Sequence, residues 1–317
     1  MAKVEEVPPF TINQLAVFVA VAEAGTLSAA AERLHMSPSA VSAALTELER
    51  LLRAQLLHRM RAKGVTLTPT GELVLPRARL ILHQAAELEA DARGVGSVTG
   101  RVRLGCYPSL APTLLPVLMS SFLERHPDVR LEITEATQDQ LTTALEAGAL
   151  DVAIMYDLGL DPDLRRTPFA HLPPRVVLPA DHRLAKRKRG LDIAELRDDP
   201  MVLLDAPPSA EHAYDCCARA GFAPKVAYRA RTYETARSFV GRGLGWTLLL
   251  QRPSADVTYE GRAVAVKEIR KPQLDPVAID VVAHRDTLLN RASRTFVDHV
   301  VRMGREHGVE GGIPQET

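Results

Sequence analysis

The sequence predicts an α/β protein in which a small helical unit, a long helix and a larger strand–helix unit follow one another. Three observations predict this order. Apolar residues recur at helical spacing over residues 11–52. A heptad pattern then continues to about residue 92, and from residue 101 short apolar strands alternate with helices. We expect boundaries at 10–68 for the first unit, 69–96 for the long helix, 101–304 for the last unit and 305–317 for a disordered tail.

Composition sets the class of protein. A chain of 317 residues that is 46% apolar and 25% charged can build two or three packed units. Its opening, MAKVEEVPPF, lacks the pattern of an export signal, and no apolar run is long enough to span a membrane. We therefore expect a cytoplasmic protein with no membrane partner. Cys106, Cys216 and Cys217 have no metal-binding or disulfide spacing, so we interpret them as buried small apolar residues.

The charge pattern favours duplex DNA as a partner. Net charge is zero, with 39 basic and 39 acidic residues, so nucleic-acid binding requires a local basic patch. Such a patch lies between Glu49 and Glu72, where five basic residues and no acidic residue occur. They are Arg50, Arg53, Arg59, Arg61 and Lys63. Aromatic residues make up only 4% of the chain, which argues against a single-strand binder that stacks bases.

The first unit reads as three helices. The first spans residues 11–24 and ends at Gly25, and the second runs from about Ser28 to Leu34 with Thr26 or Ser28 as its cap. Ser37 and Pro38 then form a cap and first-turn pair that starts the third helix. Its inner stripe is Val41, Leu45, Leu48 and Leu52, and its outer face carries Ser39, Ser42, Ala43 and Thr46.

This order of helices predicts a helix-turn-helix whose third helix enters the major groove. Residues 56–71 follow as two short strands about a turn at Gly64, which predicts a basic wing that grips phosphates. The alternative is a solvated basic loop on an ordinary three-helix domain. The candidate DNA contacts are Ser37, Pro38, Ser39, Ser42, Thr46, Arg59, Arg61 and Lys63.

The long helix over 69–96 is predicted to join protomers. Thr68 and Pro69 start it, and one apolar stripe follows a four–three spacing typical of a two-chain seam. The stripe is Val74, Ala78, Ile81, Ala85, Leu88 and Ala92. Pro76 is expected to kink the first two turns. A core helix of a single chain is the alternative.

The last unit is predicted to form two α/β lobes, the first over about 101–162 and 270–304 and the second over about 163–269. Two strand-to-helix turns, CYPSLAP and DAPPSAEH, place Ser109 and Ser209 as expected helix caps. In such folds ligands bind at the carboxyl ends of strands, where helix N-termini suit a small anion. Tyr107, Thr137 and Asp205 are neighbours in sequence. The alternative is that each serine only caps its helix.

Residues 28–75 resemble the winged helix of the LysR-type transcription regulators. The matching residues are Ser37, Ala40, Val41, Ser42, Leu48, Glu49, Leu56, Arg59, Leu67, Thr68 and Gly71. Pro38, Ala43 and Ala44 replace polar or basic residues that are common in the family, and Arg53 and Leu57 replace its usual glycine and phenylalanine. Affinity is therefore expected to depend more on phosphate contacts and DNA shape than on base contacts.

The resemblance continues more loosely to the end of the chain. The segments 145–154 and 243–249 are similar to recurrent motifs of the family's effector domain. It implies a periplasmic-binding-protein-like domain of two lobes, a linker helix that pairs protomers, and effector contacts at the positions of Ser109 and Gln138.

The sequence thus predicts a LysR-type DNA-binding regulator that responds to a small, anionic effector and forms a homo-oligomer, either a dimer or a tetramer. It contains no G-x-S-x-G elbow, HExxH motif or Walker loop, so we expect no enzymatic activity, metal or cofactor. Two alternatives stay open at this point: a redox-sensing regulator, and a solute-binding or enzymatic protein built from the same two lobes.

Overall fold

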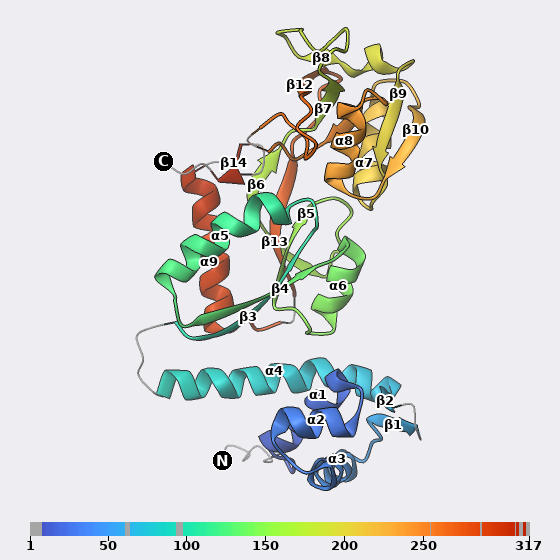
Figure 1. The fold of residues 1–317 in the computed structure, drawn as a ribbon. Coiled ribbons are helices and arrows are strands. Elements are labelled where there is room, and N and C mark those ends of the chain that lie inside the picture. The colour runs from blue at the N-terminus through green and yellow to red at the C-terminus, as the bar shows by residue number, and fades with distance from the viewer. Residues whose placement is uncertain are drawn as a thin grey trace. The chain divides into compact units, whose positions relative to one another are not determined.

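The computed structural model describes residues 8–60, 64–92, 98–253, 255–285, 287–307, 309–310 and 313–314. The chain divides into two compact units, one built mainly from residues before Val98 and the other from Val98 onward (Figure 1). Within these ranges, no helix has both the length and the apolar character that a membrane span requires.

The first unit contains the three expected helices, α1 (Ile12–Ala24), α2 (Leu27–Leu34) and α3 (Pro38–Leu52). Each begins at a hydroxyl cap: the side chains of Thr11, Thr26 and Ser37 accept hydrogen bonds from backbone N–H groups of the first turn. Gly25 ends α1 in the left-handed conformation, with φ 68°. Local chemistry therefore fixes where these helices begin and end.

A β-hairpin follows, made of β1 (Leu57–Met60) and β2 (Gly64–Leu67) in antiparallel pairing. Gly64 is the first residue of β2 and has φ 85°, and a Cβ there would collide with the carbonyl oxygen of Gly25. Val65 N–H donates to that same oxygen at 2.8 Å. Position 64 thus requires glycine, because the hairpin packs backbone to backbone against the end of α1.

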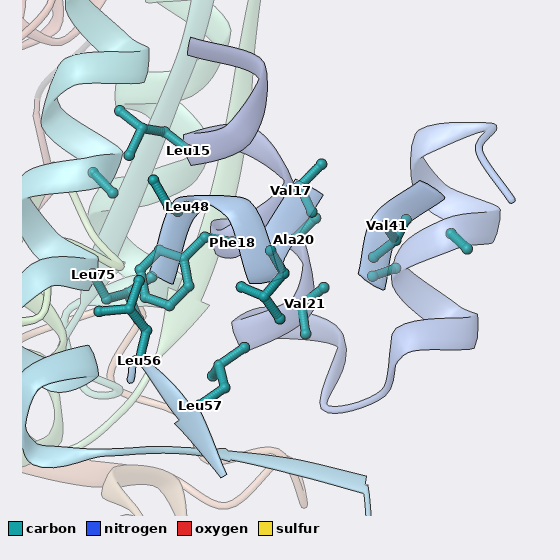
Figure 2. Packing of buried hydrophobic residues seen from close by; sticks show 14 residues of the cluster. Leu15, Val17, Phe18, Ala20, Val21, Val41, Leu48, Leu56, Leu57 and Leu75 are labelled. Atoms are coloured by element: carbon teal, nitrogen blue, oxygen red, sulfur yellow. The ribbon is translucent and has the colours of Figure 1, made fainter. Parts of the chain in front are cut away.

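The core of this unit is closed by the helix α4 (Pro69–Ala92), which runs through Pro76 as one helix. Leu75 and Ala78 of α4 are buried in the same cluster as Phe18 and Leu48 (Figure 2). Fully burying a leucine side chain such as that of Leu75 contributes roughly 1.5–3 kcal/mol to the stability of the fold. The first turns of α4 therefore belong to the core of the first unit.

This packing changes the interpretation of the predicted seam. Ala78 is buried, and Val74 and Ile81 pack against the core of the first unit. The first half of the stripe therefore makes contacts within its own chain. Further along, Leu88 is 72% exposed. The alternative of a core helix thus holds for the first half of the stripe, and only the second half is left for a partner.

The first lobe of the second unit is a five-stranded sheet in the order β4-β3-β5-β13-β6. Its strands are β3 (Gly100–Cys106), β4 (Val129–Glu135), β5 (Val152–Tyr156), β6 (Leu164–Leu172) and β13 (Val277–His284). β3 is parallel to β4 and β5, whereas β13 is antiparallel to β5 and β6. Helices α5 (Ala111–Arg125) and α9 (Arg291–His307) lie on one side of the sheet, and α6 (Gln138–Glu146) lies on the other (Figure 1). The Phe122 ring of α5 meets the Phe296 ring of α9 edge to face.

The second lobe combines a four-stranded sheet, β11-β7-β12-β8, with the parallel pair β9 and β10. Its elements are β7 (Arg175–Pro179), β8 (Leu191–Asp192), the short helix η1 (Ile193–Leu196), β9 (Pro200–Leu204), α7 (Ser209–Arg219), β10 (Lys225–Ala230), α8 (Tyr233–Gly241), β11 (Thr247–Leu249) and β12 (Val264–Lys271). Trp246, next to β11, is buried among side chains of β7, β9 and α7. This apolar cluster gives the lobe its own core.

Two expectations from the sequence differ from the structure. β6 was expected in the second lobe, but it pairs along its length with β13 and so belongs to the sheet of the first. The chain beyond Gly304 was expected to be disordered, but α9 continues to His307, and the short strands β14 (Val309–Glu310) and β15 (Ile313–Pro314) pair with each other.

Candidate functional site

Helix α3, which the sequence predicts to enter the major groove, presents two distinct faces. Val41, Leu45 and Leu48 are fully buried. On the opposite face Ser39 and Thr46 are exposed, and Ser42 is half-buried. The structure therefore gathers the predicted groove-facing residues of α3 on one open face, with small side chains that permit close approach to a duplex.

Hydrogen bonds within α3 limit which of these hydroxyl groups can donate a proton to DNA. Ser37 Oγ accepts from Ala40 N–H at 3.2 Å and lies 3.0 Å from Ser39 Oγ. Thr46 donates its hydroxyl proton to the carbonyl oxygen of Ser42 at 2.9 Å. Ser37 thus fixes the helix start, and Thr46 faces outward mainly as an acceptor and a methyl group.

The basic wing is only partly described. Arg59 lies on β1, but its side chain falls outside the described residues, as do Arg61 and Lys63 entirely. The structure does show how the hairpin is held to α3: Glu49 accepts hydrogen bonds from the N–H groups of Leu56 at 2.8 Å and Leu57 at 3.2 Å. Sequence reasoning matched Glu49 to the family but missed this positioning role.

Arg53 departs from the glycine usual in the resembling family, and the structure shows the consequence. It is the C-cap of α3 and has φ 51°, a left-handed conformation that L-residues with a Cβ adopt at a cost. The turn from α3 to β1 therefore keeps a geometry that favours glycine, although this chain has arginine there.

The two predicted effector serines are not helix caps. The N-cap residues are Leu110 for α5 and Pro208 for α7, and neither makes a side-chain cap bond. Ser109 precedes its helix by two residues and Ser209 is the first helical residue of α7, so each hydroxyl is free to bond elsewhere. The expectation that they cap their helices was wrong, and both serines instead face the cleft between the lobes.

Ser109 belongs to a partly buried hydrogen-bond network that crosses from one lobe to the other. Its Oγ lies 3.0 Å from the hydroxyl of Tyr156, and Gln251 Nε2 donates to that hydroxyl at 3.4 Å. Thr113 donates to Gln251 Oε1 at 3.0 Å, which fixes the orientation of the amide. Burial raises the pKa of Tyr156, so its hydroxyl stays protonated at neutral pH.

Either hydroxyl can be the donor in the contact between Ser109 and Tyr156, because a tyrosine oxygen can accept a hydrogen bond from Ser109 in addition to the one from Gln251. Ser209 Oγ lies 3.3 Å from the hydroxyl of Tyr107, also across the lobes. Tyr107 and Tyr156 stack edge to face with ring centroids 5.5 Å apart.

Two cavities lie between the lobes, and His212 lines both of them. A very small one is lined by Ser109, Tyr156, Ser209 and Gln251, among others. A second, of about 700 Å³, is lined by Gln138 and residues of both lobes. That volume lies within the range of small-molecule pockets.

Of the remaining predicted effector residues, Gln138 lines a cavity and Asp205 does not. Gln138 is 8% exposed and lines the large cavity. Thr137 precedes α6, and its N–H donates to Gln140 Oε1 at 3.2 Å. Asp205 pairs with Arg229 at 3.1 Å and lines neither cavity.

Sequence reasoning missed Tyr156, Gln251 and His212, which line one or both cavities. They lie far apart along the chain, and only the lobe topology brings them together.

The lining does not favour the anion that the sequence led us to expect. Among the described residues that line either cavity there is no lysine or arginine, and the large cavity carries four carboxylates. These are Asp139, Asp161, Glu211 and Asp215. Burial lowers the pKa of His212, a shift that Asp215 opposes and Arg219 reinforces, so this imidazole is neutral at physiological pH.

The three cysteines are buried and unpaired, as expected. Burial raises the pKa of Cys216 and of Cys217 to about 12, and it raises the pKa of Cys106 as well. Because the thiolate is the reactive form, these side chains are poor nucleophiles in the folded protein.

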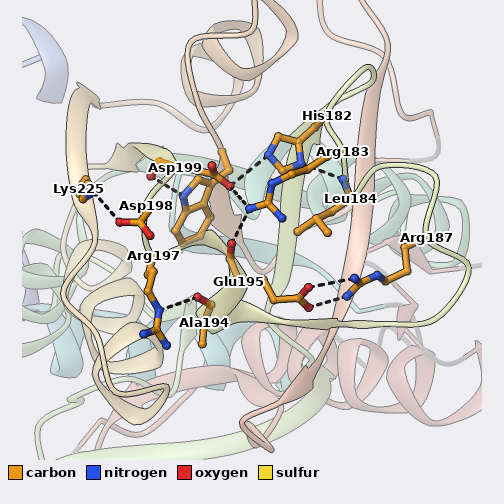
Figure 3. A network of polar contacts seen from close by, with 11 residues as sticks. His182, Arg183, Leu184, Arg187, Ala194, Glu195, Arg197, Asp198, Asp199 and Lys225 are labelled. Atoms are coloured by element: carbon orange, nitrogen blue, oxygen red, sulfur yellow. Dashed lines mark hydrogen bonds and ion pairs between the residues drawn. The ribbon is translucent and has the colours of Figure 1, made fainter.

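The basic segment 182–189 is engaged within its own lobe (Figure 3). Arg183 pairs with Asp199 at 2.9 Å and Arg187 pairs with Glu195. On the same face Lys225 pairs with the exposed Asp198 at 2.7 Å. Part of the positive charge of this segment is thus neutralised by neighbours, as expected for a solvated surface loop.

Comparisons with known proteins cover both units. Residues 12–72 match the bacterial regulatory helix-turn-helix protein of the lysR family, and residues 96–305 match the LysR substrate binding domain. A probable hydrogen peroxide-inducible genes activator of Mycobacterium avium is 35% identical over 76% of this chain and 78% of that protein.

Solved structures agree. The C-terminal domain of a probable LysR family transcriptional regulator from Rhodococcus sp. RHA1 is 52% identical, with a TM-score of 0.63, over 64% of this chain and 99% of that one. HinK, a LysR family regulator from Pseudomonas aeruginosa, is 28% identical, with a TM-score of 0.62, over 92% and 98%. The chain therefore belongs to the LysR family of DNA-binding transcriptional regulators, in which a helix-turn-helix domain is joined to a domain that binds a small-molecule effector.

Proposed function

We propose that this regulator reads its operator with the outer face of α3 and the basic wing, and adjusts its grip on DNA when a small molecule occupies the cleft between its two lobes. One observation carries the second part: a network of hydroxyls and one amide links the lobes, and Ser109 of this network lines a cavity wall. A ligand that hydrogen-bonds to Ser109 competes with the Ser109–Tyr156 contact of this network. Its binding is therefore coupled to the lobe arrangement.

The DNA-reading residues are tested by two variants with different expected signatures. Ser42→Ala is expected to weaken binding to the cognate upstream DNA selectively, because Ser42 lies on the groove-facing side of α3. Arg61→Ala is expected to weaken binding to every duplex and to lower the salt slope by about one counterion. Gel shifts at several salt concentrations distinguish the two, and unchanged shifts for both variants would contradict these assignments.

The effector site is tested with Ser109→Ala and Gln138→Ala. Each is expected to reduce effector affinity by about 1 kcal/mol or more, as for loss of one hydrogen bond. DNA affinity without effector should stay unchanged. Loss of DNA binding in Ser109→Ala without effector would instead give the residue a purely structural role.

We also propose that the chain acts in the cytoplasm as a homo-oligomer, a dimer or tetramer that spaces two copies of α3 on successive major grooves. The exposed Leu88 supports a partner on the second half of α4. The enzymatic and solute-binding alternatives are set aside, because LysR members are DNA-binding regulators and not enzymes.

Redox sensing deserves separate treatment, since one relative is named as a hydrogen peroxide-inducible genes activator. That response needs a thiol that ionises readily, whereas all three cysteines here are buried and burial raises the pKa of each. We therefore favour a bound small molecule over thiol oxidation as the signal for this chain.

A further inference from the structure

The large cavity between the lobes has a pronounced charge asymmetry. Its wall is formed by the start of α6, the segment 158–161 after β5, and the start of α7 with the two prolines before it. Asp139 and Asp161 stand on the first lobe, and Glu211 and Asp215 on the second. Each lobe therefore brings two carboxylates to the same cavity.

No lysine or arginine among the described residues lines this wall, and the positive groups nearest to Asp139 and Glu211 are the N-terminal ends of α6 and α7, in whose first turns they stand. Arg166 pairs with Asp157 at 2.9 Å and donates to the carbonyl oxygens of Leu160 and Asp161. Arg219 donates to the carbonyl oxygen of Gln273. Neither arginine is among the described residues that line the cavity, and His212 there is neutral at physiological pH.

A second feature of the wall is independent of the carboxylates. Gln138 Nε2 donates to the carbonyl oxygen of Leu158 at 2.7 Å, so the amide orientation is fixed. Its Oε1 is buried and has no hydrogen-bond partner among the described residues. A buried acceptor without a donor is costly. A ligand that carries N–H groups would satisfy it.

We propose, building on the effector cleft above, that the effector is a small organic cation: an amine with an apolar body and at least one ammonium group. The carboxylates attract the ammonium, Gln138 Oε1 accepts one of its protons, and Leu158, Leu160, Pro207 and Pro208 contact the carbon skeleton. Because acidic residues come from both lobes, a compound with two ammonium groups would draw the lobes together. An anion of the same size would meet four like charges.

A metal ion fits this cavity poorly. Within the described part of the chain, no three histidine, cysteine, aspartate or glutamate side chains are placed to hold one. The cavity of about 700 Å³ is also far larger than a coordinated ion needs. The separated carboxylates instead suit an extended molecule with charges at its ends.

The test compares three matched series on the full-length protein: α,ω-diaminoalkanes, diols and dicarboxylates of equal carbon number, measured by calorimetry at low and high salt. The amines are expected to bind, more weakly at high salt, and the dicarboxylates are not. Glu211→Gln and Asp215→Asn should each reduce amine affinity roughly two- to fivefold, as for exposed ion pairs. Asp198→Asn, which neutralises an exposed carboxylate elsewhere on the same lobe, should leave it unchanged.

The outcomes separate this inference from the proposed function. If dicarboxylates bind, Ser109→Ala weakens them and the DNA footprint responds, the effector cleft stands and the cationic ligand is refuted. If amines bind and depend on Glu211 and Asp215 but never alter the footprint, the cation site stands and its regulatory role falls. Absence of amine binding throughout, or amine binding that ignores both substitutions, overturns the inference.

Discussion

Replacing Tyr156 by phenylalanine removes one hydroxyl from the network that links the lobes. The Tyr156 side chain is 1% exposed, and its hydroxyl is hydrogen-bonded to Ser109 and to Gln251. Gln251 is itself 2% exposed, so its Nε2 would lose a partner where water has little access. Leaving such a buried donor unsatisfied costs about 1–3 kcal/mol. Ser109 is less buried and can turn to another acceptor, so we place most of the cost on Gln251.

Urea denaturation followed by fluorescence of the single tryptophan measures this cost, because Trp246 lies in the core of the second lobe. Tyr156→Phe is expected to lower the free energy of unfolding by about 1–3 kcal/mol with little change in the denaturant slope. Tyr259→Phe is the matched control: this tyrosine is 86% exposed, and the change should be within experimental error. Equal stability of Tyr156→Phe and the parent would refute the network as a structural link between lobes.

Four further predictions follow. Gly71→Ala is expected to destabilise the first unit by about 1–3 kcal/mol in thermal melts, because a Cβ there would overlap the carbonyl oxygen of Leu56; an unchanged melting temperature would contradict this packing. Arg53→Gly is expected to stabilise it by about 1 kcal/mol, since the residue has φ 51°, and a loss of stability would show that the arginine side chain matters more than the backbone. Leu88→Glu should reduce oligomer mass in light scattering without lowering the melting temperature, and an unaltered mass would remove this part of α4 from the interface. Native protein treated with hydrogen peroxide at pH 7 should retain all its thiols on later titration in denaturant, because burial raises the pKa of Cys216 to about 12; rapid thiol loss would restore the redox alternative.

The helices of the DNA-reading unit could be predicted closely because their ends are local. Ser37 and Pro38 start α3, and Gly25 ends α1, through contacts with residues three or four positions away. The use of α4 could not be predicted in the same way. Its stripe fits both a core and a seam, and only the fold shows that Ala78 is buried within the chain while Leu88 is exposed.

The effector site was even harder to predict from local sequence patterns than the use of α4. Ser109 and Ser209 were singled out as helix caps, and they reach the cleft for a different reason, through Tyr156 and Tyr107. The partners lie 47 and 102 positions away, which no local pattern reports. The sequence favoured an anionic ligand because helix N-termini are visible in sequence, whereas the convergence of acidic residues from two lobes, on which the proposed cationic ligand rests, requires the fold.

The central claim is that occupancy of the cleft between the lobes changes how the protein sits on DNA. Hydroxyl-radical footprinting of the upstream DNA tests it most directly, with and without the tightest-binding compound of the three matched series at saturating concentration. We predict that the compound shifts the footprint boundaries of the parent protein, and that the same shift in Gln138→Ala requires a higher concentration of compound, because Gln138 lines the large cavity. Identical footprints with and without the compound, at a concentration where calorimetry shows the cleft to be full, would contradict the account.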